Sequence, residues 1–356
     1  MVLQEINYQG FRNLVDDQLK FVDDYNFIIG ENGSGKTNLL EAIFYAGLAS
    51  SFRAREERDL ISFDNQFLKV DATANGKKAA IYLDRDRKKV TLQGNEVRRL
   101  SNFVGWLDVT FLSIEDIWIV RGAPAKRRYF LDWLIAKLSP TYLSHLVEYR
   151  KIVKQRNKVL QMINENGDDS LLEVYDEQFI KHGNELYRER RQKLPELQKH
   201  VSSIGARFGL CKLNIGYQST CPHFRIDHSL LGKMRQKEIV CGTTLVGPHR
   251  DDILLSKEGR PLKNYASEGE ERVVSIALKL AEAEMLYQKK TAWPILLLDE
   301  VGAELDYNKK EILLELMKGQ IFYASTQMPE FTKIFQQKQF TVFTIKRGSI
   351  EVSRTN

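Results

Sequence analysis

The chain has 356 residues, of which 43% are hydrophobic and 28% charged, and this balance is typical of a soluble globular protein and disfavours a disordered one. Its formal net charge of +6 and its pI near 9.0 favour polyanionic partners such as nucleic acids. No apolar run reaches the length of a membrane span, the N-terminus lacks a leader pattern, and the three cysteines are irregularly spaced, so we expect a cytoplasmic protein without a membrane partner.

The first hundred residues are expected to form strands interrupted by one helix. Apolar residues alternate over 68–74 and again over 79–83, and the dipeptide between these runs predicts a hairpin turn. A second turn is predicted at 93–95. Near the start, the apolar run 25–29 leads into the segment GENGSGKT, after which apolar residues recur at helical spacing as far as Leu48.

This segment fits the phosphate-loop pattern G-x-x-x-x-G-K-[ST], and its position between a strand and a helix disfavours a chance glycine-rich turn. In such a loop, backbone N–H groups at a helix N-terminus converge on phosphate oxygens. Lys36 is expected to reach the β- and γ-phosphates, and the Thr37 hydroxyl to ligate Mg²⁺. The predicted ATP-binding residues are Gly30, Glu31, Asn32, Gly33, Ser34, Gly35, Lys36 and Thr37.

From 114 to about 208 the pattern is helical and highly charged, with turn residues at 164–169. This part is too short for a long coiled coil and predicts an inserted helical lobe. The later chain predicts, in order, a short hairpin after 248, a helix over about 268–288, a strand over 295–298, another helix, a strand over 321–324 and a terminal hairpin turning at 347–349. We therefore expect one lobe from 1–112 with 290–356, and a second, mainly helical lobe from 113–289.

The segment ILLLDE (295–300) is an apolar strand that delivers two acids to its carboxyl end. Such strands also occur in folds without a site, but a doubly wound sheet binds its ligand at this edge, where a phosphate loop also lies. Asp299 is expected to hold Mg²⁺, and Glu300 to polarise the attacking water. Lys36 and Glu300 are thus the predicted catalytic residues.

The segment YASEGEER (265–272) places Ser267 and Gly269 before a helix. It fits a capped helix, in which Ser267 accepts a hydrogen bond from an N–H near residue 270, and also a second anion-binding helix start. It resembles the S-x-G-x signature of ABC-type ATPases. That resemblance implies that Ser267 and Gly269 contact the ATP held by a second copy, so that ATP bridges a homodimer. It also implies nucleotide neighbours in AELD (303–306), at Asp306, and at Thr326.

Further segments extend the resemblance to the RecF family of bacterial recombination mediators. They are GFRN (10–13), SFR (51–53), RGAPAKRRYFLD (121–132), YRKIVKQRNKVL (149–160) and GPHRDD (247–252). The resemblance implies an α/β fold, namely an ABC-type ATPase head of the P-loop NTPase class with a mixed-sheet lobe and an inserted helical lobe that carries the signature. It also implies that Arg12, Asn13 and Arg53 lie near the nucleotide.

The chain departs from the family pattern at several positions. Glu268 and Glu270 stand where the family usually has Gln, which adds negative charge at a site meant for phosphate. Glu300 stands where the family often has a second Asp. The pair Asp299-Glu300 matches the wider ABC pattern, and this pattern favours hydrolysis. Ser113 occupies the position of the usual Gln ligand to Mg²⁺, and Glu115 is the nearest substitute.

Basic residues cluster around 121–128 and on the following helix. A charge run is usually a solvated face, but the family's association with DNA at junctions between single and double strands favours backbone contacts here. The candidate DNA contacts are Arg53, Arg121, Lys126, Arg127, Arg128, Lys151 and Lys154.

These features together predict an ATP-dependent DNA-binding protein of recombinational repair and replication-fork restart. It would form an ATP-bridged homodimer on DNA, with gapped duplex or strand junctions as substrates, and would be a weak, DNA-stimulated ATPase whose slow turnover releases the DNA. The resemblance implies RecR as a partner. The alternative is an ABC-type ATPase subunit that energises a protein partner without binding DNA.

Overall fold

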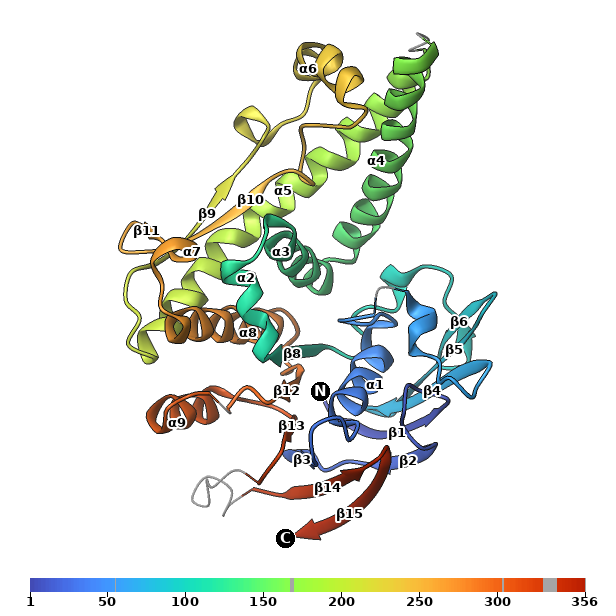
Figure 1. Ribbon diagram of the computed structural model, residues 1–356, viewed down its shortest axis with the longest axis vertical. Coiled ribbons are helices and arrows are strands. Elements are labelled where there is room, and N and C mark those ends of the chain that lie inside the picture. The colour runs from blue at the N-terminus through green and yellow to red at the C-terminus, as the bar shows by residue number, and fades with distance from the viewer. Residues whose placement is uncertain (55, 167–169, 303, 329–337, 356) are drawn as a thin grey trace. The chain divides into compact units, whose positions relative to one another are not determined.

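The structure is a computed structural model that describes residues 1–54, 56–166, 170–302, 304–328 and 338–355 (Figure 1). The chain forms two compact units, one from 1–116 with 276–356 and the other from 117–275. Residues 113–116 and 276–289, which the sequence analysis places in the helical lobe, belong to the first unit. The reason is that residues 276–289 are part of helix α8 (Glu268–Lys290), and this part of the helix contacts strands of the first unit. For example, Thr110 Oγ1 donates to Glu282 Oε1 at 3.2 Å.

A largely parallel sheet forms the centre of the first unit. Its strands are β3 (Tyr25–Ile29), β8 (Val109–Ser113), β12 (Ile295–Asp299), β13 (Ile321–Ser325), β14 (Phe340–Lys346) and β15 (Ser349–Thr355). The order is β15-β14-β3-β13-β12-β8, and only β15 runs antiparallel to its neighbour. The apolar strands β3, β12 and β13 are buried along nearly their whole length, as expected of a sheet covered on both faces. Their carboxyl ends meet at one edge.

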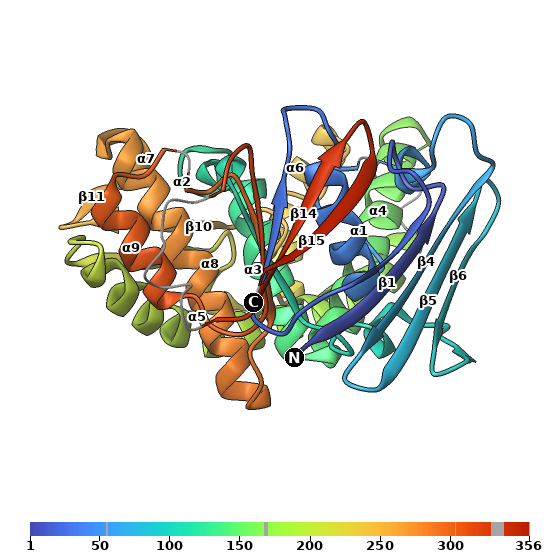
Figure 2. The same ribbon diagram turned by 90° about the horizontal axis from the view of Figure 1, so that it is seen from below.

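An antiparallel sheet forms the second layer of this unit, in the order β2-β1-β4-β5-β6-β7. Its strands are β1 (Leu3–Gln9), β2 (Asp17–Lys20), β4 (Phe67–Ala74), β5 (Lys77–Asp84), β6 (Lys88–Leu92) and β7 (Asn95–Glu96). The predicted hairpins β4–β5 and β6–β7 are confirmed. Figure 2 shows β1, β4, β5 and β6 as one layer beside α1 (Lys36–Leu48).

Helix α1 packs against both sheets, since it contacts β8, β12 and β13 of the parallel sheet and β4 and β5 of the antiparallel one. It is therefore buried on most sides, and even its Glu41 is inaccessible to solvent. Among the residues that the structure describes, two further α-helices belong to this unit. They are α8 (Glu268–Lys290), whose first residues belong to the second unit, and α9 (Tyr307–Leu316).

The second unit is mainly helical. Its helices are α2 (Trp118–Arg121), α3 (Pro124–Leu138), α4 (Pro140–Asn166), α5 (Ser170–Arg207), α6 (His228–Cys241) and α7 (Leu262–Tyr265). Its strands are β9 (Leu213–Gln218), β10 (Asp252–Lys257) and β11 (Arg260–Pro261), in the order β11-β10-β9. The long helices α4 and α5 pack side by side (Figure 1).

Short 3-10 helices connect several of these elements. They are η1 (Glu57–Leu60), η2 (Leu100–Asn102), η3 (Ile114–Ile117) and η4 (Pro222–Phe224). Among the helices that the structure describes, none is both long and apolar enough to cross a bilayer.

Candidate nucleotide site

The phosphate loop lies between the end of β3 and the first turn of α1, as predicted. Gly35 has φ 120°, in the left-handed region that favours glycine, and a side chain at Gly30 would come within 2.5 Å of the Ile345 carbonyl. Glycine at position 30 therefore lets the loop pack closely against Ile345, and glycine at position 35 allows the left-handed backbone. The free N–H groups at the start of α1 and the positive end of the helix dipole make this loop a site for anions.

The loop and the acidic strand meet through two pairs of side chains. Lys36 Nζ donates to the carbonyls of Gly30 at 2.8 Å and Glu31 at 3.1 Å, and it lies 3.2 Å from Glu300 Oε1. The Thr37 hydroxyl donates to Asp299 Oδ2 at 2.7 Å. The structure therefore brings together the residues predicted for phosphate binding, metal binding and catalysis.

Asp299 ends β12 and Glu300 follows it, at the carboxyl edge of the parallel sheet. Burial raises the pKa of Asp299 above its ordinary value, and the neighbouring carboxylate of Glu300 adds to the increase. Glu300 has φ 55°, an uncommon conformation for a residue with a side chain, and its N–H donates to the Ala324 carbonyl at 3.0 Å. Backbone strain of this kind is concentrated at functional sites.

The hydroxyl of Thr37 and the carboxylate of Asp299 are the hard oxygen donors that Mg²⁺ prefers, so this pair fits the predicted metal. Ser113 is the register partner of Asp299 on β8. The predicted substitute ligand Glu115 is exposed on η3, whereas Asp116 accepts a hydrogen bond from the Ser113 N–H at 2.7 Å. The sequence analysis missed Asp116, whose pKa burial raises.

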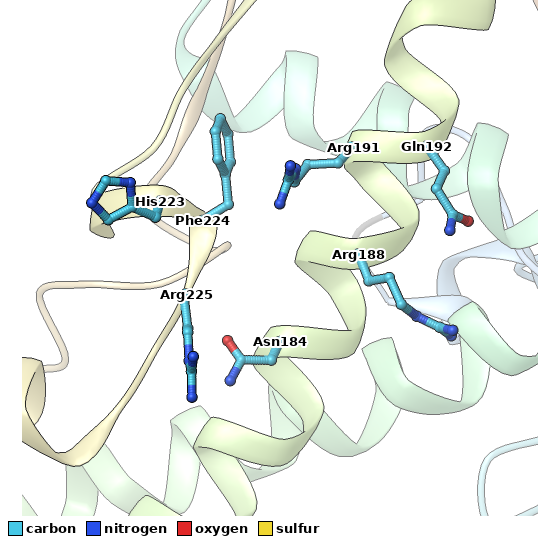
Figure 3. Close-up of a pocket in the computed structure, with 7 residues that line it drawn as sticks. All are labelled: Asn184, Arg188, Arg191, Gln192, His223, Phe224 and Arg225. Carbon is cyan, nitrogen blue, oxygen red and sulfur yellow. The ribbon is translucent and has the colours of Figure 1, made fainter.

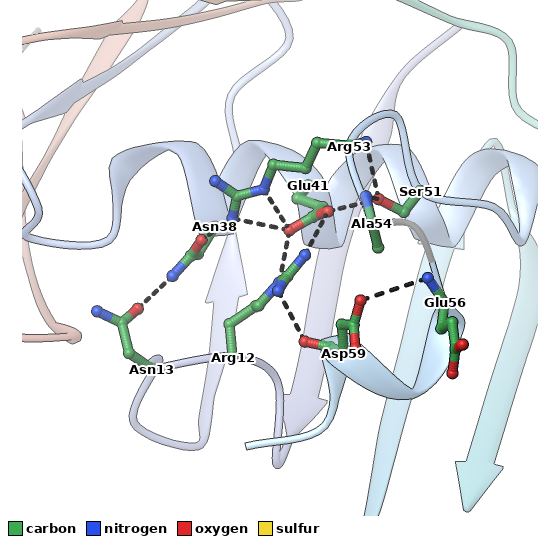
Figure 4. A network of polar contacts seen from close by, with 9 residues as sticks. All are labelled: Arg12, Asn13, Asn38, Glu41, Ser51, Arg53, Ala54, Glu56 and Asp59. Carbon is green, nitrogen blue, oxygen red and sulfur yellow. Dashed lines mark hydrogen bonds and ion pairs between the residues drawn. The ribbon is translucent and has the colours of Figure 1, made fainter. Parts of the chain in front are cut away.

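Arg12 and Arg53, two of the predicted nucleotide neighbours, converge on the buried Glu41 of α1 (Figure 4). Arg12 Nε and Arg53 Nε each lie 3.0 Å from Glu41 Oε2, and Ser51 Oγ donates to Oε1 at 2.5 Å. Burial alone would raise the pKa of Glu41, but the hydrogen bonds from the two arginines and the serine hold it below its ordinary value.

The same network reaches the phosphate loop through Asn38, which follows Thr37. The Asn38 side chain donates to Asn13 Oδ1 and accepts from Arg53, so Asn13 and Arg53 both touch the first turn of α1. The sequence analysis missed Glu41, because an acid in an apolar helix carries no signal of its own. Arg53, also a candidate DNA contact, is bound to Glu41, although 37% of its side chain is exposed.

The terminal hairpin also supports the loop. The Gly348 N–H donates to the Ser34 carbonyl at 2.9 Å, and a side chain at Gly348 would come within 1.9 Å of the Asn13 carbonyl. The Ser34 hydroxyl is buried and has no hydrogen-bond partner among the residues that the structure describes. It is a donor available at the phosphate loop.

The signature segment is a capping box at the start of α8. Ser267 Oγ accepts from the Glu270 N–H at 3.3 Å, and Glu270 Oε2 accepts from the Ser267 N–H at 2.9 Å. The predicted capped helix is thus confirmed. A side chain at Gly269 would meet no atom within 4 Å, which leaves open space on this side of the helix start.

The acids that depart from the family pattern all have basic partners. Glu270 lies 2.6 Å from Lys257 Nζ, which holds the pKa of Glu270 below its ordinary value. Glu268 lies 3.3 Å from Arg272 and 3.8 Å from Arg121, and Arg121 also lies 2.6 Å from Glu271. The negative charge expected at the signature is therefore balanced locally.

The two remaining nucleotide candidates are Asp306, directly before α9, and Thr326, directly after β13. Ala303, the first residue of the AELD segment, is outside the described residues. Asp306 caps α9 by accepting from the Lys309 N–H at 2.9 Å. Thr326 is exposed and directly follows β13, so it lies at the same edge of the sheet as Asp299.

The predicted DNA contacts differ greatly in accessibility. Arg127 is buried, with Nε 2.7 Å from Asp252 Oδ1 and Nη1 donating to the Gly122 carbonyl at 2.8 Å, so its prediction as a DNA contact is wrong in this conformation. Arg128 is half-buried and donates to the Asp251 carbonyl, and Arg121 is engaged with α8. The exposed candidates are Lys126, Lys151 and Lys154, of which Lys151 pairs with Glu148 at 2.9 Å.

The GPHRDD segment stabilises the helical unit from within. Asp251 is buried and accepts from the hydroxyls of Thr220 at 2.7 Å and Tyr217 at 2.9 Å. The Pro248 carbonyl accepts from the buried Arg190 at 2.8 Å, and Arg190 also lies 2.7 Å from Asp132 Oδ1. These contacts give the segment a structural role.

Comparison with known proteins identifies the family. A family model described as the RecF/RecN/SMC N-terminal domain matches residues 2–354. The DNA replication and repair proteins RecF of Bacillus cytotoxicus and Oceanobacillus iheyensis are 33% and 34% identical to the chain, over 99% and 98% of it and 98% and 100% of those proteins. A solved structure of the recombination mediator RecF with ATP, in the RecFOR pathway, superimposes with a TM-score of 0.89 at 30% identity, covering 99% of this chain and 97% of that one. An Smc head shares the fold at 15% identity, with a TM-score of 0.56 and coverage of 99% and 98%. The predicted fold class is therefore confirmed, and the chain belongs to the RecF family of DNA replication and repair proteins, built on an ABC-type ATPase head.

Proposed function

We propose that this chain is an ATP-dependent DNA-binding protein of recombinational repair and fork restart, which dimerises around ATP on DNA and releases it by slow hydrolysis. The observation that carries this proposal is the convergence of Lys36 and Thr37 with Asp299 and Glu300 at one edge of the parallel sheet. The solved RecF structure with ATP and the repair function named for the relatives support it.

The first turn of α1 would bind the phosphates of ATP through its free N–H groups. Lys36 is buried and contacts the loop carbonyls and Glu300, so its ammonium would exchange these contacts for the β- and γ-phosphates. Mg²⁺, held by Thr37 and Asp299, would neutralise charge on the same phosphates. The hydrogen bonds from Arg12 and Arg53 to Glu41 hold α1 in place, and α1 carries both Lys36 and Thr37.

Glu300 would orient the attacking water and take its proton. Its carboxylate lies at the phosphate loop, and its backbone is held by the hydrogen bond to Ala324. Replacement by Gln keeps the size of the side chain but removes the base, so the variant should bind ATP and fail to hydrolyse it.

Dimerisation would depend on the exposed start of α8. Ser267 and Gly269 present a helix N-terminus with open space beside it, and this arrangement suits the γ-phosphate bound by a second copy. A site that is complete only in the dimer would make turnover by a single chain slow. Gapped duplex or a strand junction is the proposed substrate, and RecR, a member of the same pathway, is the proposed protein partner.

Light scattering during size exclusion tests the proposal with wild type, Ser267→Arg and Glu300→Gln, each with ATP, ADP or no nucleotide, and with or without a short gapped duplex. We expect ATP to double the 41.2 kDa mass of wild type, Glu300→Gln to keep the dimer longer, and DNA to co-elute with it. Ser267→Arg should stay monomeric, whereas the exposed control Ser229→Arg should behave as wild type. A constant monomer that ignores DNA would favour the alternative of an ATPase that acts on a protein partner.

A further inference from the structure

A pocket of about 550 Å³ lies on the helical unit, between α5 and the end of η4 with the next residue, Arg225 (Figure 3). Its lining includes Asn184, Arg188, Arg191, Gln192, Phe224 and Arg225. The α5 residues recur at intervals of three and four, so they share one face of that helix. This volume is within the range of ligand sites in proteins.

The pocket is strongly basic. Arg188, Arg191 and Arg225 line it, and none of the described residues that line it is acidic. Arg188 lies 2.6 Å from Glu185 and is partly neutralised. Arg191 and Arg225 are exposed, and within the described chain no carboxylate lies at ion-pair distance from either. Two positive charges are therefore available to an anionic ligand.

The walls of the pocket are held in place. The Asn184 side chain donates to the Ile226 carbonyl at 2.9 Å and accepts from the Ile226 N–H at 2.8 Å, which fixes the segment beside α5. His223 and Phe224 are consecutive residues with φ of 53° and 55°, a strained conformation for residues that carry a side chain. Such strain persists only where the surrounding structure enforces it, and it is common at ligand sites.

The ring of Phe224 is occupied by neighbouring side chains. The Arg191 guanidinium lies over the ring at 5.4 Å from its centroid, and the Tyr217 ring lies 5.5 Å away on a tilted plane. The aromatic ring therefore orients Arg191 and is not free to stack on a base. An acidic peptide would also need apolar space for its other side chains, whereas a phosphate backbone needs mainly charge and hydrogen-bond donors.

We propose that this pocket binds consecutive phosphates of a nucleic-acid strand, as a contact that is separate from the nucleotide site and independent of base sequence. The inference rests on the proposed DNA-binding function and adds a specific surface to it. Arg191 and Arg225 hold the phosphates, and Gln192 adds a neutral donor. None of these residues was among the contacts predicted from the sequence.

The test is fluorescence anisotropy of a fluorescein-labelled gapped duplex with wild type and Arg191→Gln/Arg225→Gln, over a range of KCl concentrations. Loss of two phosphate contacts should raise Kd about tenfold at 0.1 M salt and lower the slope of log Kd against log salt by about 1.8. The control Arg85→Gln/Arg260→Gln makes the same change in charge at exposed positions on β-hairpins and should bind as wild type. The circular-dichroism spectrum should be unchanged in both variants, which shows that they are folded, and binding of a fluorescent ATP analogue at the site in the other unit should also be unchanged.

The outcomes separate the two proposals. If wild type does not bind the duplex, both the proposed DNA-binding function and this site fail. If wild type binds but the pocket variant matches the control in Kd and salt slope, only the pocket assignment is overturned. If the pocket variant keeps its affinity for DNA but no longer binds a labelled hexaglutamate peptide that wild type binds, the pocket is a site for a protein ligand. That result would also overturn the pocket assignment.

Discussion

Replacement of Glu41 by Gln should destabilise the ATPase unit, because a buried carboxylate holds two arginines there. Breaking a buried ion pair by removal of one partner costs about 3–5 kcal/mol. The side chains of Arg12 and Arg53 are 21% and 37% exposed, so solvent would compensate them in part, and Gln keeps one acceptor oxygen. We therefore expect a loss of about 2–3 kcal/mol, which lowers Tm by about 5–10 °C for a unit of this size.

The effect should depend on pH in a defined direction. The pKa of Glu41 in the folded protein is below its ordinary value of 4.5, so its stabilisation is complete above that pH and is lost as the pH falls through the folded pKa. Calorimetry at pH 7 and at lower pH should thus show a gap between wild type and Glu41→Gln that narrows on acidification. The exposed control Glu96→Gln should shift Tm by less than about 2 °C. A gap under 1 °C at pH 7, or one that stays constant into acid, would refute this reasoning.

Further predictions concern the loop, the metal pair, the helical unit and the terminal hairpin. Lys36→Met should weaken binding of a fluorescent ATP analogue about 100-fold, since it removes the charge that faces the phosphates; wild-type affinity would contradict the assigned role. Because burial raises the pKa of Asp299, protons should compete with Mg²⁺ at a higher pH than at an exposed aspartate, so titration calorimetry should show Mg²⁺-dependent ATP binding weakening on acidification before an ordinary aspartate is protonated, and Asp299→Asn should lose that dependence. Arg190→Met leaves the buried Asp132 with only the exposed Arg150 as a basic partner and should cost about 3 kcal/mol, seen as faster hydrogen exchange in α3 and α5; unchanged protection would count against the polar core. Gly348→Ala forces a side chain against Asn13 at φ 81° and should weaken ATP binding about tenfold, which an unchanged Kd would disprove.

The elements nearest the chemistry could be predicted from the sequence because their patterns are local. The strand, loop and helix over 25–48 and the apolar strand ending at Asp299 have strong periodicity and little ambiguity. By contrast, β9 is short and only partly buried, so it lacks clear alternation, and its place is set by pairing with β10. Ion pairs between residues that are distant in the chain give no local pattern in the sequence, as the contacts of Glu41 with Arg12 and Arg53 show.

Charge runs were the least informative part of the sequence. Arg127 and Arg128 are adjacent, yet one is buried against Asp252 and the other is half-exposed. A helix turns about 100° per residue, so neighbouring basic residues face different surroundings, and only the packing decides which of them reach solvent. The basic pocket beside α5 could not be predicted either, because Arg225 and Arg191 are distant in sequence and only the fold brings them together.

The position of β3 in the parallel sheet determines when this protein can first function during its synthesis. Both neighbours of β3, namely β13 and β14, come from the last part of the chain, and the Gly348 contact with Ser34 is made later still. On the ribosome, the phosphate loop therefore emerges early with both edges of its strand unpaired, and it stays incomplete until nearly the whole chain has been translated. A nascent chain should gain protection by ATP only after β14 and Gly348 have left the ribosome, and truncation before β13 should yield an aggregating product with a complete helical insertion but no functional nucleotide site.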